Sequence, residues 1–93
     1  MSVISEDMVP VLARHYRFQF EPAQQAYVLL YPEGMVKLGA SAGEIMKRVN
    51  GTATVSSIIA DLQAAYPGVD LRADVIDFLE HAHGKGWIHA KRP

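Results

Sequence analysis

The sequence has no cysteine, no excess of positive charge and no long hydrophobic run, and each absence excludes a class of protein. Without cysteine the chain forms neither disulfides nor thiolate metal sites. Nine Lys and Arg against ten Asp and Glu give a formal net charge of −1, so no cationic surplus exists to neutralise a phosphate backbone. The apolar runs are far shorter than the roughly 20 residues of a membrane-spanning helix, and residues 1–7 lack the basic start of a secretory signal. We therefore expect a cytoplasmic protein.

What is present is the composition of an ordinary globular domain. The chain has 93 residues and a mass of 10.3 kDa, with 49% hydrophobic and 20% charged residues. A chain of this length buries roughly two thirds of its unfolded surface, which leaves room for one core. We therefore expect residues 1–93 to form a single domain. Residues 1–13 show no clear periodicity, and we expect them to form an extended N-terminal arm.

Three short segments carry the signals of β-strands. Residues 16–20 alternate between aromatic and polar side chains, while residues 26–31 are apolar on both faces, as in a central strand. A Pro-Glu-Gly turn follows, and residues 35–38 form a third strand that ends at Gly39. The short connections predict an antiparallel meander, in which residues 35–38 lie at the edge.

The second half of the chain has the periodicity of three short amphipathic helices. The first is predicted to begin at Ser41, whose spacing from Glu44 matches a capping box, and to end at Gly51. Thr54 and Asp70 are predicted to cap the second and third helices. The predicted fold is α+β and winged-helix-like: a three-stranded antiparallel β-meander followed by a three-helix bundle.

No arrangement of side chains is typical of an enzyme or a metal site. His81 and His83 point to different sides of a helix, and His15 and His89 lie at opposite ends of the chain, so we expect no metal site. No serine stands in a nucleophile elbow, and the glycines form neither a phosphate loop nor a dinucleotide fingerprint. We expect neither catalysis nor a cofactor.

A winged-helix DNA-binding domain is the main alternative, because the second and third helices resemble a helix-turn-helix. A recognition helix needs cations near its N-terminus. The third helix instead carries Asp70, Asp74, Asp77 and Glu80 against Arg72. These carboxylates repel a duplex, and recognition of a peptide or protein is therefore favoured.

The predicted edge strand is the surface best suited to such recognition. An edge strand presents unpaired amides and carbonyls that accept an added strand. On the alternative interpretation, Lys37 only protects this edge from aggregation. The edge and the arm of residues 1–13 also permit a homodimer formed by edge-strand or arm exchange.

One string in the sequence is distinctive: LLYPEGMVKL at residues 29–38. Weaker patterns accompany it, namely Pro10-Val11-Leu12, Arg17-Phe18, Ser41-Ala42-x-Glu44-Ile45, Ile58-x-x-x-Leu62, Asp74-Val75-x-x-Phe78-Leu79 and Gly86-Trp87. Together they resemble the PqqD family, the small peptide-binding proteins of pyrroloquinoline quinone (PQQ) biosynthesis. Two turn positions depart from the family pattern, with Asn50 in place of a frequent Asp and Gly39 in place of a frequent Asn.

The resemblance implies a peptide chaperone or carrier with no catalytic activity. PqqD-like proteins belong to the RiPP recognition elements, and they bind the ribosomal precursor peptide PqqA and present it to the radical S-adenosylmethionine enzyme PqqE. An adaptor that contacts only PqqE is an alternative. By analogy with related domains, the peptide adds as a strand beside the third strand, in a groove bounded by the third helix. The strand contacts implied are Met35, Val36, Lys37 and Leu38, and those of the helical wall are Asp74, Val75, Asp77, Phe78 and Ala82.

Overall fold

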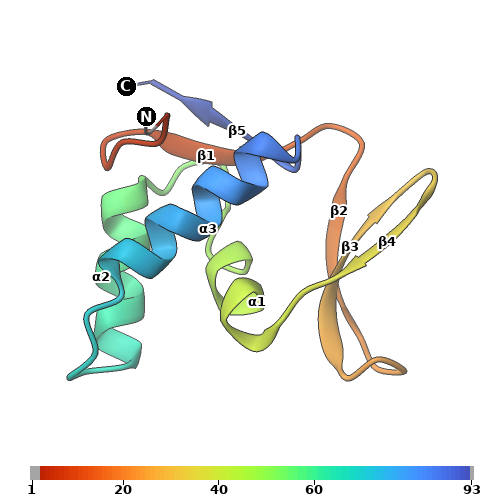
Figure 1. Ribbon diagram of the computed structural model, residues 1–93, viewed down its shortest axis with the longest axis horizontal. Helices are drawn as coiled ribbons and strands as arrows, with labels where there is room; N and C mark the ends of the chain where they lie inside the picture. Colours follow the sequence, from red (N-terminus) through yellow and green to blue (C-terminus); the bar gives the residue numbers. More distant parts are fainter. Residues whose placement is uncertain (1–2, 93) are drawn as a thin grey trace.

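The computed structural model describes residues 3–92, which form five strands and three helices (Figure 1). The elements in chain order are β1 (Val9–Leu12), β2 (Arg17–Glu21), β3 (Ala26–Tyr31), β4 (Gly34–Lys37), α1 (Ala40–Met46), α2 (Val55–Ala65), α3 (Arg72–Gly84) and β5 (Ile88–Lys91). The predicted α+β class is confirmed. None of the helices in the described part has both the length and the apolar character needed to cross a bilayer.

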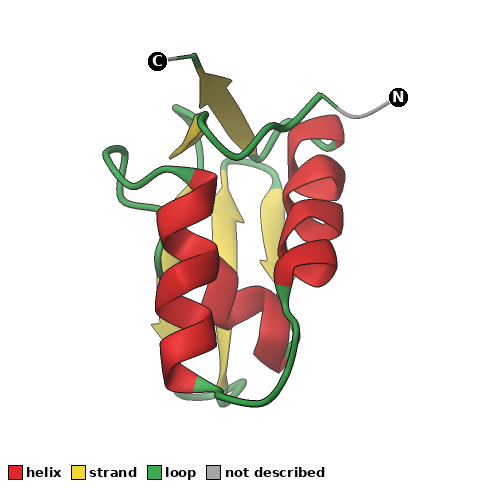
Figure 2. Cartoon of the chain, turned by 90° about the vertical axis from the view of Figure 1, so that its left-hand side faces the viewer, coloured by secondary structure: helices red, strands yellow, loops and turns green. Residues whose placement is uncertain are grey.

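Strands β2, β3 and β4 form an antiparallel sheet in that order. In the register of this sheet Leu29 lies opposite Phe18 on one side and Val36 on the other. Because side chains alternate between the two faces of a strand, these three residues share the face that packs on the helices. Figure 2 shows the two long helices in front of the strands, with the short helix between them.

The predicted meander is incomplete, because the two ends of the chain form a second, two-stranded sheet. Strand β1 falls inside the predicted arm, and β5 follows Trp87. They are antiparallel, with Pro10 opposite Ala90 and Leu12 opposite Ile88. The sequence did not predict β1, because it contains Pro10, and proline lacks an amide donor and is rare in strands. Residues 1–2 of the predicted arm and the final residue of the basic tail lie outside the described part.

Helix α1 begins before its predicted cap. The N-cap is Gly39, which makes no side-chain capping bond, and Ser41 lies inside the helix. Because the N-cap is Gly39, Glu44 lies beyond the capping-box position, and its carboxylate instead accepts a hydrogen bond from Arg48 Nη1 at 3.0 Å. A guanidinium is a stronger partner for a carboxylate than a backbone amide. The helix ends at Met46, earlier than predicted.

The other two helix starts lie close to their predicted positions. Thr54 is the N-cap of α2, as predicted, and its hydroxyl oxygen accepts the amide of Ser57 at 3.1 Å. The N-cap of α3 is Leu71 rather than Asp70. Asp70 precedes this N-cap by one residue, and its carboxylate still accepts a hydrogen bond from the amide of Arg72 at 3.1 Å. It therefore satisfies one of the free backbone donors at the start of α3.

Residues 3–8 of the arm lie on the chain's own helices. The carboxylate of Glu80 on α3 accepts the amides of Val3 and Ile4 at 3.2 and 3.0 Å. The carbonyl of Met8 accepts the amide of Val55, at the start of α2, at 2.9 Å. The arm therefore joins the two long helices.

One core fills the space between the helices and the inner face of the three-stranded sheet. Leu29 of β3 and Leu79 of α3 have no exposed surface. The buried members of this core are Ile4, Leu29, Leu38, Ile45, Met46, Val55, Ile58, Ile59, Leu62, Val75, Leu79, Ala82 and Ile88.

Gly43 determines how closely α1 approaches β3. A Cβ at this position would lie 3.0 Å from Cδ2 of Tyr27. The ring of Tyr27 stacks on Phe18, with centroids 4.8 Å apart, and meets the edge of Phe20 at 5.3 Å. Because these neighbours hold the ring, a larger residue at position 43 pushes α1 away from the sheet.

We predict that Gly43→Ala lowers the free energy of unfolding by about 1–2 kcal/mol, because overpacking outweighs the better helix propensity of alanine. Gly84→Ala is the matched control, since a Cβ there meets no atom within 4 Å. It should leave stability unchanged or raise it by up to about 1 kcal/mol. Urea denaturation of the two variants measures the difference, and equal stabilities would contradict the tight packing at Gly43.

Candidate functional site

Strand β4 presents unpaired backbone groups, because within residues 3–92 it pairs only with β3. In an antiparallel pair, successive residues direct their N–H and C=O alternately toward the partner strand and away from it. Leu38 donates its amide to the carbonyl of Tyr27 at 2.9 Å, so Val36, two residues earlier, also faces β3. Met35 and Lys37 therefore direct their N–H and C=O groups outward.

The side chains of the same segment hold the edge in place. Leu38 is 5% exposed and belongs to the core, and Val36 is partly buried against it. Met35 is 43% exposed and Lys37 is also exposed, on the opposite face. The four predicted strand contacts thus divide into two residues with outward backbone groups and two that anchor the strand to the core.

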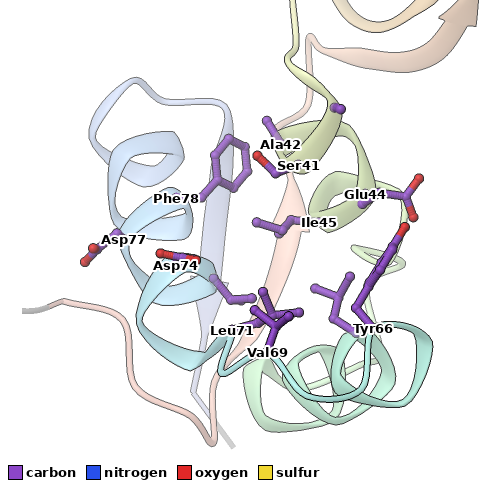
Figure 3. Close-up of a pocket in the computed structure, with 13 residues that line it drawn as sticks. Ser41, Ala42, Glu44, Ile45, Tyr66, Val69, Leu71, Asp74, Asp77 and Phe78 are labelled. Carbon is purple, nitrogen blue, oxygen red and sulfur yellow. The ribbon is translucent and has the colours of Figure 1, made fainter.

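A pocket with a cavity volume of about 710 Å³ lies where β4 leads into α1 (Figure 3). The first residues of α1, the end of α2 and the first half of α3 line it, together with the loop between α2 and α3. Its walls are mostly apolar, with Ile45, Leu62 and Phe78 among the lining side chains. Large apolar pockets with a few polar groups are the usual form of binding sites.

Figure 3 shows how the walls are arranged. Phe78 of α3 faces Ser41 and Ala42 of α1 at one end of the pocket, and Ile45 points into the space between the helices. At the other end lie Tyr66 and Val69, which are 47% and 51% exposed. Two large hydrophobic side chains exposed at one rim leave apolar surface that a partner can cover.

The pocket is lined by three carboxylates and by no Lys, Arg or His. Glu44 is already paired with Arg48, which also donates to Asp61 at 2.5 Å. Burial lowers the pKa of Arg48, but the hydrogen bonds to Glu44 and Asp61 raise it by more. Arg48 thus offsets only part of the charge of Glu44 and Asp61, whereas Asp74 and Asp77 on α3 form no ion pair within residues 3–92.

The structure brings most of the predicted helical wall together. Asp74, Val75, Asp77 and Phe78 all line the pocket. Ala82 lies further along α3, has no exposed surface and does not line the pocket. A guest reaches its side chain only by opening the core, so Ala82 is not among the peptide contacts that we propose.

The predicted contacts did not include the residues of α1 and α2 that line the pocket. Ala42, Ile45 and Leu62 follow the same helical period as core residues, so their pattern does not distinguish a pocket wall from a core position. Tyr66 and Val69 gave a usable signal. They are large apolar residues on either side of a Pro-Gly turn, where exposure is expected.

An open strand edge beside an apolar, acidic pocket defines a small α+β recognition domain. The family described as coenzyme PQQ synthesis protein D (PqqD) matches residues 26–88. This chain therefore belongs to the PqqD family, and the resemblance found in the sequence is confirmed.

Relatives and a solved structure agree with this assignment. A PqqA binding protein of Pseudomonas paraeruginosa is 56% identical over 89 residues, which cover 95% of this chain and 97% of the relative. A PqqA binding protein of Stutzerimonas stutzeri is 49% identical over 92 residues, or 98% and 100% of the two chains. The solution NMR structure of the PqqD truncation of Methylobacterium extorquens PqqCD, a stand-alone RiPP recognition element, matches with a TM-score of 0.79 at 30% identity and covers 95% and 96% of the two chains.

We predict that hydrogen exchange separates the two kinds of amide in β4. The amides of Val36 and Leu38 are bonded to β3 and should exchange at least about tenfold more slowly than those of Met35 and Lys37. Deuterium exchange followed residue by residue by NMR measures these rates. Equal protection at all four positions would contradict the outward direction of the Met35 and Lys37 groups.

Proposed function

We propose that this chain binds the precursor peptide PqqA by strand addition to β4 and presents it to PqqE, without catalysing a reaction itself. The observation that carries the proposal is the pair of outward-facing residues, Met35 and Lys37, next to the interhelical pocket. The names of the relatives, PqqA binding proteins at 56% and 49% identity, support the choice of peptide.

The strand edge and the pocket are both needed for useful affinity. Two outward residues offer four backbone groups, and each hydrogen bond contributes about 1 kcal/mol net. Ordering a flexible peptide costs about 2–5 kcal/mol, before the loss of rigid-body freedom is counted. Backbone bonds alone therefore leave little net binding, and apolar burial beside α3 must provide the remainder.

Strand addition also suits presentation to an enzyme. A peptide that pairs with β4 becomes the new edge of the sheet, so its second row of backbone groups stays open. A partner enzyme can then approach the peptide without displacing it. Compared with a winged-helix domain, α2 and α3 correspond to the helix-turn-helix and the β3–β4 hairpin corresponds to the wing. The ligand that we propose is a peptide rather than DNA.

Titration with PqqA should shift the amides of Met35–Leu38 and of α3 more than any others. NMR of labelled protein measures these shifts, and duplex DNA is the negative ligand because Asp74 and Asp77 repel it. Shifts confined to β2, on the far side of the sheet, would contradict strand addition to β4. Binding of PqqE without any peptide shifts would identify an adaptor instead.

Lys37→Pro should weaken PqqA binding by about 5–30-fold, because proline removes an outward donor and its ring obstructs the guest strand. Edge strands tolerate proline, so we expect the variant to fold, and circular dichroism checks this. Lys37→Ala is the matched control, since it removes the charge but keeps the amide, and it should change the dissociation constant by less than about threefold. Equal affinities of the two variants would argue against outward donation by this amide.

A further inference from the structure

We propose that the pocket between α1, α2 and α3 holds one large apolar side chain of the bound peptide, and that Asp74 selects a Lys or Arg beside that side chain. The proposal rests on the proposed function, because it requires a peptide paired with β4. It adds a position on the guest and a residue of this chain that determines specificity.

The pocket continues directly from the strand edge. Only Leu38 and Gly39 separate Lys37, the last residue of β4, from Ala40, the first residue that lines the pocket. A guest strand advances by about 3.3 Å per residue, as β4 does. A peptide paired with Lys37 therefore places a side chain in the pocket within about three or four residues of the paired segment.

The chemistry of the walls selects an apolar side chain. Ile45 and Phe78 face the cavity from opposite helices (Figure 3), and the buried side chain of Leu62 also lines it. The cavity of about 710 Å³ lies within the usual range for binding pockets. It is wide enough for one bulky side chain with part of its backbone, and the exposed surfaces of Tyr66 and Val69 extend the apolar rim.

The negative charge at the rim of the pocket favours a Lys or Arg next to that apolar residue in the peptide. Glu44 shares the guanidinium of Arg48 with Asp61, at 3.0 and 2.5 Å, so its charge is partly offset, whereas Asp74 forms no ion pair within residues 3–92. Asp77 points away from the pocket in Figure 3, whereas Asp74 lies between Leu71 and Phe78 on the α3 wall. Asp74 is thus the uncompensated carboxylate nearest the cavity, and it attracts a guest cation and repels a guest carboxylate. A nucleic acid is disfavoured by the same charge.

The test is a scan of PqqA against three forms of the protein. Each apolar residue of the peptide is replaced in turn by Ala and each Lys or Arg by Gln, and dissociation constants are measured with the wild type, Asp74→Asn and Glu33→Gln. Glu33 is the matched control, because it makes the same change of charge in the turn at the opposite end of β4.

We expect one apolar residue to weaken binding by about tenfold or more when it is replaced by Ala. Replacing a Lys or Arg within about two residues of it by Gln should weaken peptide binding two- to fivefold, as expected for an exposed ion pair. This second loss should vanish in Asp74→Asn and persist in Glu33→Gln. A double-mutant cycle combines the native or Gln-substituted peptide with the wild type or Asp74→Asn. It isolates the interaction between Asp74 and the peptide cation.

Two outcomes would overturn the proposal. In one, the loss caused by replacing the cation is the same in Asp74→Asn as in the wild type. In the other, PqqA shifts the amides of Met35–Leu38 but not those of Ile45 and Phe78. That result would exclude the pocket as a peptide contact while remaining consistent with strand addition to β4. A peptide that shifts none of these residues refutes the proposed function itself.

Discussion

The pairing of β4 with β3 fixes both the place of the candidate site and the direction of its hydrogen-bonding groups. Leu38 takes part in two contacts at once, since its amide bonds to Tyr27 and its side chain enters the core. The register is therefore held at the end of β4 that leads to the pocket. A slip by one residue would turn Leu38 outward and exchange the inward and outward amides, so the same contact protects the fold and the site.

The close approach of α1 to β3 brings the pocket to this edge. The chain passes from β4 into α1 within two residues, Gly43 allows α1 to pack closely on Tyr27 of β3, and α3 forms the opposite wall of the pocket. The charges follow the same arrangement. Arg48 pairs with both Glu44 on α1 and Asp61 on α2, and the arm occupies Glu80 on α3, whereas Asp74 and Asp77 form no ion pair within residues 3–92.

The sequence predicts structural features that depend on local residue patterns, but not those that depend on contacts between residues far apart in the chain. The edge segment before Gly39 and the Thr54 cap follow from alternation, turn residues and capping chemistry, all of which act within a few residues. The β1–β5 sheet depends on two ends of the chain that meet only in the folded state. The pocket was only partly predicted, because its α1 and α2 walls carry the same apolar period as core positions. The Ser41 cap was wrong because α1 begins two residues earlier, with Gly39 as its N-cap.

The β1–β5 ribbon places the two ends of the described chain side by side, with Val9 opposite Lys91 (Figure 1). Figure 1 also shows β4 on the other side of the molecule from both ends. A covalent extension at either end would therefore begin on the side of the molecule away from the edge of β4. The solved relative from Methylobacterium extorquens is itself a PqqD truncation of a protein named PqqCD. In this chain the two described ends and the open edge of β4 are thus separated in space, and a tether attached at either end would start away from that edge.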